Sequence, residues 1–150
     1  MSKVIRRRVL LHSGLAVGAA LLAPAAHACE FFGVNLRVMH PWTRATAEGS
    51  TTALVNLKFD QVMQDDRLIG VETPVAETVE MAGAEAGAGV DVSIPAGETT
   101  SLGEGGTLVR LVGLKMPLEV GRSYPLKLVF EKGGVIDATL NVDYTSFRFK

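Results

Sequence analysis

The sequence predicts an all-β fold, an antiparallel sandwich or barrel in a single domain that follows an export signal. Three observations support this fold class. Apolar and polar residues alternate over several short stretches after residue 30, which is typical of strands with one buried face. Turns rich in glycine and proline separate these stretches. No window of helical length after residue 30 keeps a 3.6-residue apolar period. Short strands with regular turns favour a sandwich or barrel.

Residues 1–28 predict a secretory signal peptide, which is not part of the fold. The basic residues Arg6–Arg8 precede an apolar run, Val9–Leu22. The small residues of Ala26-His27-Ala28 then form a cleavage site before Cys29. The apolar run is too short to cross a bilayer with apolar flanks, so we expect no membrane span.

The signal leaves the export route and the fate of Cys29 open. The arginines fit twin-arginine export, but the usual phenylalanine is missing, so Sec export fits as well. Cys29 directly after small residues also fits a lipoprotein, although His27 suits that pattern poorly. We therefore expect soluble release into the periplasm, with lipid anchoring at Cys29 as the alternative.

The composition of residues 29–150 limits both the fold and the function. Their number suits one domain. The first 28 residues carry four basic residues and no acidic one, which leaves 11 basic against 16 acidic residues in the rest. An acidic domain is a poor nucleic-acid binder, so no nucleic-acid partner is expected. The chain has one cysteine, which excludes an internal disulfide and a thiolate zinc site.

Four strands are expected from clean two-residue alternation, and turn signals separate them. Their apolar positions, in chain order, are Val34/Leu36/Val38, Ala53/Val55/Leu57/Phe59, Leu126/Leu128/Phe130 and Ile136/Ala138/Leu140/Val142. Lys132-Gly133-Gly134 lies between the last two and can supply the positive φ angles of a hairpin turn. Further turns are expected at Glu48–Ser50, Pro95–Gly97, Gly103–Gly106 and Glu119–Arg122. The segment Ala82–Gly89 has no bulky side chain and predicts a flexible surface loop.

Five short stretches, in this order and spacing, resemble the PCuAC family of periplasmic copper chaperones. They are His40–Thr46, Asp65–Ala76, Val79–Met81, Ile94–Gly97 and Gly105–Gly121. The resemblance implies a cupredoxin-like β-sandwich in the periplasm that delivers Cu(I) to the copper centres of cytochrome oxidase. It also implies copper-transfer or oxidase-assembly proteins as partners.

The resemblance also locates the family's metal site on this sequence. The family uses a histidine or methionine, a methionine in the following loop, and a distant His-x-Met pair. Thioether sulfur and imidazole both suit copper. On this chain the first position falls at Ala82, and the His-x-Met pair falls at Leu108 and Arg110. The loop methionine would lie within Gly83–Ser93, which holds no methionine or histidine. A degraded copper site is therefore expected, and a permanently charged arginine would repel a cation there.

Four other residues are weak substitute candidates for copper ligands: Cys29, Met81, Met63 and His40. Strand alternation turns Met81 away from the first ligand position, so it is expected to fill the core. Met63 lies in a polar turn and is expected to be exposed. A structural role in the His-Pro-Trp stretch is expected for His40. Cys29 would offer a thiolate and an amine if it became the new N-terminus.

Two functional hypotheses remain, and neither is an enzyme. The first is a copper chaperone of the PCuAC type whose metal site is degraded. The second is a metal-free binding module that uses the face around Arg110, where Arg44 and Arg67 could help to bind an anionic partner. No Ser/His/Asp set and no phosphate-binding glycine loop are present, which excludes the common enzyme sites.

Overall fold

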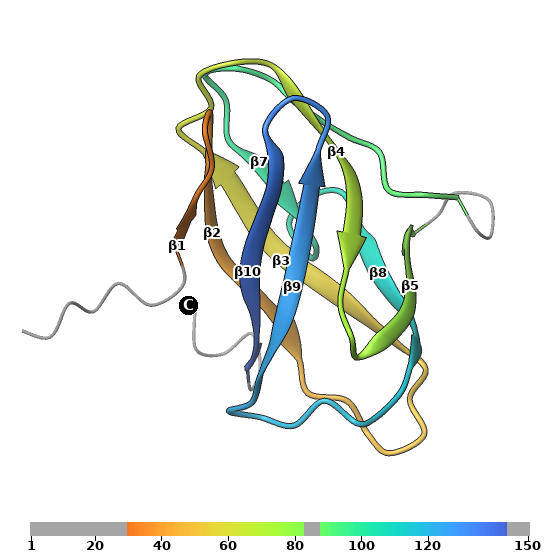
Figure 1. Cartoon of the computed structure of the whole chain (residues 1–150). Coiled ribbons are helices and arrows are strands. Elements are labelled where there is room, and N and C mark those ends of the chain that lie inside the picture. Colours follow the sequence, from red (N-terminus) through yellow and green to blue (C-terminus); the bar gives the residue numbers. More distant parts are fainter. Residues whose placement is uncertain (1–29, 83–87, 144–150) are drawn as a thin grey trace, which may run out of the picture.

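The computed structural model describes residues 30–82 and 88–143 (Figure 1). The expected signal peptide, Cys29 and the centre of the expected loop at Ala82–Gly89 lie outside these ranges. Ten strands make up the described fold: β1 (Glu30–Phe32), β2 (Arg37–Arg44), β3 (Thr52–Asp60), β4 (Asp66–Glu72), β5 (Ala76–Met81), β6 (Val92–Ile94), β7 (Thr100–Leu102), β8 (Val109–Leu114), β9 (Ser123–Phe130) and β10 (Gly134–Asp143). No helix within these ranges is long and apolar enough to cross a membrane.

The strands form one curled sheet whose two halves face each other. The strand order is β5-β8-β3-β2-β10-β9-β4-β6, with β1 also paired to β2 and β7 to β3. Figure 1 shows β10, β9 and β4 as one layer in front of β2, β3 and β8. The all-β sandwich predicted from the sequence is thus confirmed. One difference from the expected antiparallel pattern is the ladder between β2 and β10, which is parallel and sets Trp42 opposite Asn141.

The predicted apolar faces form the core between the layers. Val55, Leu57 and Phe59 of β3 are at most 3% exposed, as the alternation requires. Phe59 meets Phe130 of β9 edge to face, with ring centroids 5.6 Å apart and an interplanar angle of 83°. This geometry suits the ring quadrupoles and joins the two layers.

The first expected strand begins later than its apolar alternation indicates. Val34 is 80% exposed instead of buried. It lies in a turn that is closed by a hydrogen bond of 2.9 Å from Gly33 N to Leu36 O, and β2 starts only at Arg37. The prediction for Val34 was wrong because a tight turn can carry apolar residues at alternate positions without burying them.

The expected hairpin between β9 and β10 is confirmed, and a buried carboxylate holds it. Gly134 has a φ of 75°. Asp66, 3% exposed at the start of β4, accepts hydrogen bonds of 2.9 Å from the backbone N–H groups of Lys132 and Gly133. These bonds satisfy backbone donors that the turn leaves without ladder partners. The tip of the hairpin is therefore fixed to the neighbouring strand β4.

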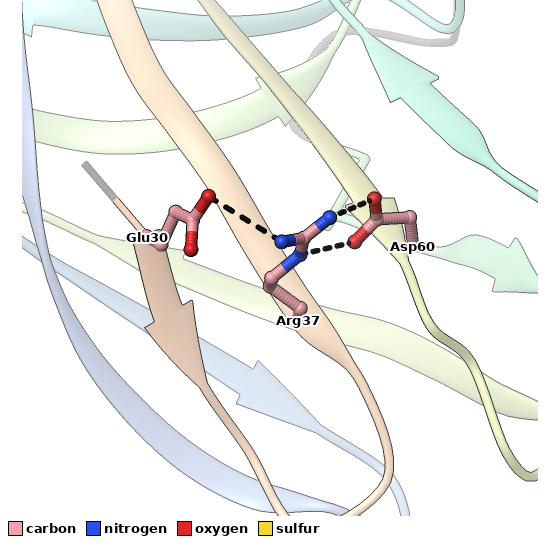
Figure 2. A network of polar contacts seen from close by, with 3 residues as sticks. All are labelled: Glu30, Arg37 and Asp60. Carbon is pink, nitrogen blue, oxygen red and sulfur yellow. Dashed lines mark hydrogen bonds and ion pairs between the residues drawn. The ribbon is translucent and has the colours of Figure 1, made fainter. Parts of the chain in front are cut away.

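A polar network ties β1 to the sheet (Figure 2). Arg37 of β2 donates to both carboxylate oxygens of Asp60 at the end of β3, over 2.8 and 2.7 Å. Its third contact is with Glu30 of β1, at 3.3 Å. Bidentate pairs of this kind are short, and their geometry is specific. Arg37 therefore fixes the first described residue of the chain to two neighbouring strands.

The Arg37–Asp60 pair should make stability sensitive to acid. The hydrogen bonds from Arg37 lower the pKa of Asp60 below its ordinary value, about 3.9. Above the ordinary pKa of an aspartate, the pair contributes its full stabilisation. As the pH falls towards the lower pKa of Asp60 in the folded protein, this stabilisation is lost, because the unfolded chain binds more protons than the folded chain in that range. Asp60→Asn should flatten the loss of unfolding free energy below about pH 4, measured by urea unfolding. Asp137→Asn, on the exposed side of β10, is the matched control and should leave the slope unchanged.

Candidate functional site

Strands β5 and β8 bring the expected ligand positions together on one surface. The two strands are antiparallel with Met81 opposite Val109, and Ala82 N donates to Leu108 O over 2.9 Å. Val109 and Leu111 are fully buried, whereas Leu108 is 41% exposed. Alternation therefore turns Leu108 and Arg110 outward. We name Glu80, Ala82, Leu108 and Arg110 the mapped face.

An ion pair occupies the mapped face. Arg110 lies directly opposite Glu80 in the ladder, and its Nη2 is 3.2 Å from Glu80 Oε1. The Glu80 side chain is only 15% exposed, so water screens this pair less than a surface pair. Arg110 Nε is also buried and has no hydrogen-bond partner among the described residues. The face thus presents a guanidinium that is already paired with a carboxylate and an apolar side chain, and neither is a ligand for a copper ion.

A cleft of about 340 Å³ opens beside Arg110, and Arg44 also lines it. Arg44 donates to both oxygens of Glu104, at 2.5 and 2.9 Å, and these bonds lower the pKa of Glu104. The backbone N–H of Glu104 donates in turn to Asn56 Oδ1 over 2.9 Å. Two of the three arginines expected to suit an anionic partner therefore share one cleft, and each has a carboxylate partner.

The third arginine lies elsewhere in the fold. Arg67, on β4, pairs with Asp91 at 2.5 Å and lines a different pocket together with Asp65 and Lys132. It does not belong to the surface around Arg110, so the expected three-arginine cluster is reduced to Arg44 and Arg110.

The substitute copper ligands are dispersed over separate elements. Met81 packs against the core, as expected, and Met63 is 81% exposed in the turn after β3. These two side chains therefore do not share a site. His40 lies at an irregularity of β2 and has a φ of 47°. Cys29 lies outside the described residues. Across residues 30–82 and 88–143, no three His, Cys, Asp or Glu side chains form a group that could hold a metal.

Sequence reasoning missed both carboxylates that pair with the arginines of this region. Glu80 could have been placed on the mapped face, because it lies on β5 two residues before Ala82, which directly follows that strand. Its pairing with Arg110 depends on the register of two strands some thirty residues apart, which no local pattern reports. Glu104 gave no signal beyond its place in a glycine-rich turn.

Comparison with known proteins places the chain in a family. A family described as "LpqE-like: Putative lipoprotein LpqE-like" matches residues 36–142. The chain belongs to the LpqE-like family. A relative called "Putative lipoprotein Lxx21020", from Leifsonia xyli subsp. xyli (strain CTCB07), is 33% identical over 107 residues. That match covers 66% of this chain and 64% of the relative, so the LpqE-like chain spans less than two thirds of the relative's length.

Solved structures similar to this LpqE-like protein are PCuAC domains, which confirms the resemblance predicted from the sequence. The apo PCuAC domain from PmoF1 has a TM-score of 0.69 at 28% identity, over 77% of this chain and 99% of that domain. The copper-bound PCuAC domain from PmoF2 has a TM-score of 0.68 at 29% identity, over 77% and 98%. Cu(I)-DR1885 from Deinococcus radiodurans, at 23% identity, has a TM-score of 0.58 over 82% and 85% and shows the fold alone.

Proposed function

We propose that this LpqE-like protein is a relative of the PCuAC copper chaperones that has lost the family copper site and uses the mapped face to bind a partner without metal. The ion pair between Arg110 and Glu80 is the observation that carries the proposal. It occupies the side of β8 where the family pattern would place a His-x-Met pair. The proposed role is not enzymatic.

The chemistry of the mapped face opposes Cu(I). A soft cation needs sulfur or imidazole ligands, and Ala82, Leu108 and Arg110 supply neither. The guanidinium keeps its charge at any physiological pH, and its pairing with Glu80 leaves that carboxylate less available to bind a cation. The exposed apolar Leu108 beside the ion pair of Arg110 and Glu80 instead suits a protein surface that presents an apolar side chain next to polar groups.

The partner we propose is a copper-transfer or oxidase-assembly protein. The proposal rests on the likeness to PCuAC domains, one of which was solved with copper bound. A protein that keeps the shape of a copper carrier but lacks its ligands can occupy the carrier's docking site without delivering metal. Fold likeness alone does not fix a partner, so the metal-binding test comes first.

A competition titration with a Cu(I) chelator tests the loss of the copper site. We expect the protein to bind Cu(I) at least about 100-fold more weakly than the PCuAC domain of PmoF2 that was solved with copper bound. Loss of residues that only support metal ligands already costs about 10- to 100-fold in affinity, and here the ligands themselves are missing. Tight one-to-one binding would refute the proposal. In that case Cys29→Ser and Met81→Leu would show which substitute residue is the ligand.

We further propose that the chain is exported and that Cys29 carries a lipid at the membrane facing the periplasm. The sequence alone favoured soluble release after residue 28. The lipoprotein descriptions of the family and of the Leifsonia relative support the alternative in which Cys29 is acylated. Mass spectrometry of the exported protein separates the two outcomes, since acylation adds the mass of a diacylglyceryl group to the N-terminal residue.

A further inference from the structure

Four exposed apolar side chains gather at one end of the fold. Phe32, Val34, Met63 and Val135 are 68%, 80%, 81% and 56% exposed, respectively. Phe32 ends β1, Val34 and Met63 lie in the turns after β1 and β3, and Val135 is near the start of β10. These turns and the hairpin between β9 and β10 lie together at the upper end of Figure 1. We name these four residues the apolar tip.

The four side chains form one surface and are not scattered. Phe32, Val34 and Val135 line the same open groove, about 620 Å³ in volume, between β1 and the start of β10. Met63 joins them through the turn after β1, because its backbone N–H donates to Asn35 O over 2.8 Å. Single exposed apolar residues are normal, but a contiguous group marks a surface that something covers.

Hydrogen bonds and ion pairs hold the segments on both sides of the apolar tip. The network in Figure 2 fixes β1 through Arg37, which pairs with both Glu30 and Asp60. On the other side, Asp66 holds the hairpin next to Val135. A preorganised apolar surface loses little conformational entropy when it is covered. The surface that covers the tip can therefore bind it without first ordering it.

The position of Cys29 indicates what covers the tip. Cys29 lies three residues before Phe32, and a fully extended chain spans at most about 3.6 Å per residue. A lipid on Cys29 would therefore anchor the chain at a residue that lies at most roughly 11 Å from Phe32. We propose that the apolar tip rests on the phospholipid bilayer that anchors the protein, so that the tip and the lipid together set the orientation of the domain. This inference rests on the acylation of Cys29 proposed above.

The alternative cover is a second copy of the chain. A stable protein interface needs about 800 Å² on each partner, which four side chains do not provide. A bilayer sets no such threshold, because an acyl anchor and a small apolar surface add their contributions to membrane binding. The anchor also explains how a domain with excess acidic residues stays close to a phospholipid surface.

The experiment uses the full chain, exported by bacterial cells, purified in detergent and reconstituted into phosphatidylcholine vesicles with brominated acyl chains. Bromine quenches tryptophan fluorescence only where the ring enters the bilayer. We expect Phe32→Trp and Val34→Trp to lose about half of the added emission, since interfacial side chains reach the acyl boundary. Ile69→Trp, at an exposed β4 position outside the tip, is the matched control and should keep its emission. Trp42 gives the same background in every variant.

Each outcome decides between the proposals. Equal quenching at positions 32, 34 and 69 in an acylated protein overturns the tip inference and leaves the anchoring proposal intact. An unmodified Cys29 in the mass spectrum overturns both the tip inference and the anchoring proposal. The copper titration tests the loss of the copper site and is independent of these two. Analytical ultracentrifugation of Cys29→Ser tests for a second copy. If this variant is a dimer and the added substitution Val34→Ser makes it a monomer, a second copy covers the tip and the inference is overturned. Two tryptophan variants are used in case one of them does not fold, and circular dichroism shows whether each variant is folded.

Discussion

The triple substitution Ala82→His, Leu108→His and Arg110→Met is expected to create a Cu(I) site on the mapped face. Residues 82 and 108 lie opposite each other, joined by the hydrogen bond from Ala82 N to Leu108 O at 2.9 Å. Side chains at such positions have Cβ atoms about 5 Å apart, close enough to share one metal ion. Alternation places residue 110 on the same side as residue 108. Two imidazoles and a thioether would then converge on the mapped face.

We expect the affinity for Cu(I) to rise at least about 100-fold over the natural chain, measured by the same chelator competition. Arg110→Leu is the matched control, because it removes the charge and adds no ligand. It should leave Cu(I) binding as weak as before. If the triple variant folds and gains no affinity, residues 82, 108 and 110 do not correspond to the family ligands, and the proposed loss of the copper site loses its basis.

The substitution with the largest expected effect on stability is Gly103→Ala. Gly103 has a φ of 96°, which an alanine rarely adopts. An added Cβ would also lie 2.1 Å from Asn56 Oδ1 and 2.8 Å from the backbone oxygen of Val55. Asn56 is 4% exposed, and its displacement would break its bonds to Glu104 N and Trp42 O. We expect a loss of about 3 kcal/mol in unfolding free energy from strain and lost hydrogen bonds.

Gly105→Ala in the same turn is the control. Its added Cβ would meet nothing within 4 Å, so the unfolding free energy should change by less than about 0.5 kcal/mol. Urea unfolding of both variants measures the difference. Similar losses for the two substitutions would show that the turn tolerates a side chain at neither position, and that contact with Asn56 is not the cause.

The sequence predicted the core strands because each has one buried face. Leu126, Leu128 and Phe130 follow the two-residue period, and all three are buried as expected. The hairpin at Gly134 was predictable because its positive φ favours glycine. Val34 misled the prediction because alternation does not distinguish a strand from an apolar turn. The parallel pairing of β2 with β10 joins residues about a hundred positions apart, and no local pattern specifies such a partner.

For the candidate site, the sequence supplied the positions but not their surroundings. Ala82, Leu108 and Arg110 were placed by family resemblance, and strand alternation correctly predicted that Met81 turns inward. The ion pairs of Arg110 with Glu80 and of Arg44 with Glu104 could not be predicted, because they depend on how strands and turns pair in three dimensions. The apolar tip could not be predicted either, since its members come from three separate segments whose proximity only the fold creates.

The parallel ladder between β2 and β10 has a consequence for the order in which the domain forms. β10 is the last strand among the described residues, yet it lies between β2 and β9 in the middle of the sheet. Until β10 has been synthesised, β2 and β9 have no common neighbour, and Leu140 is missing from the core. Loop-closure entropy must be overcome before such distant contacts can form. The domain therefore cannot complete its tertiary structure until its last described strand has been synthesised and has joined the sheet.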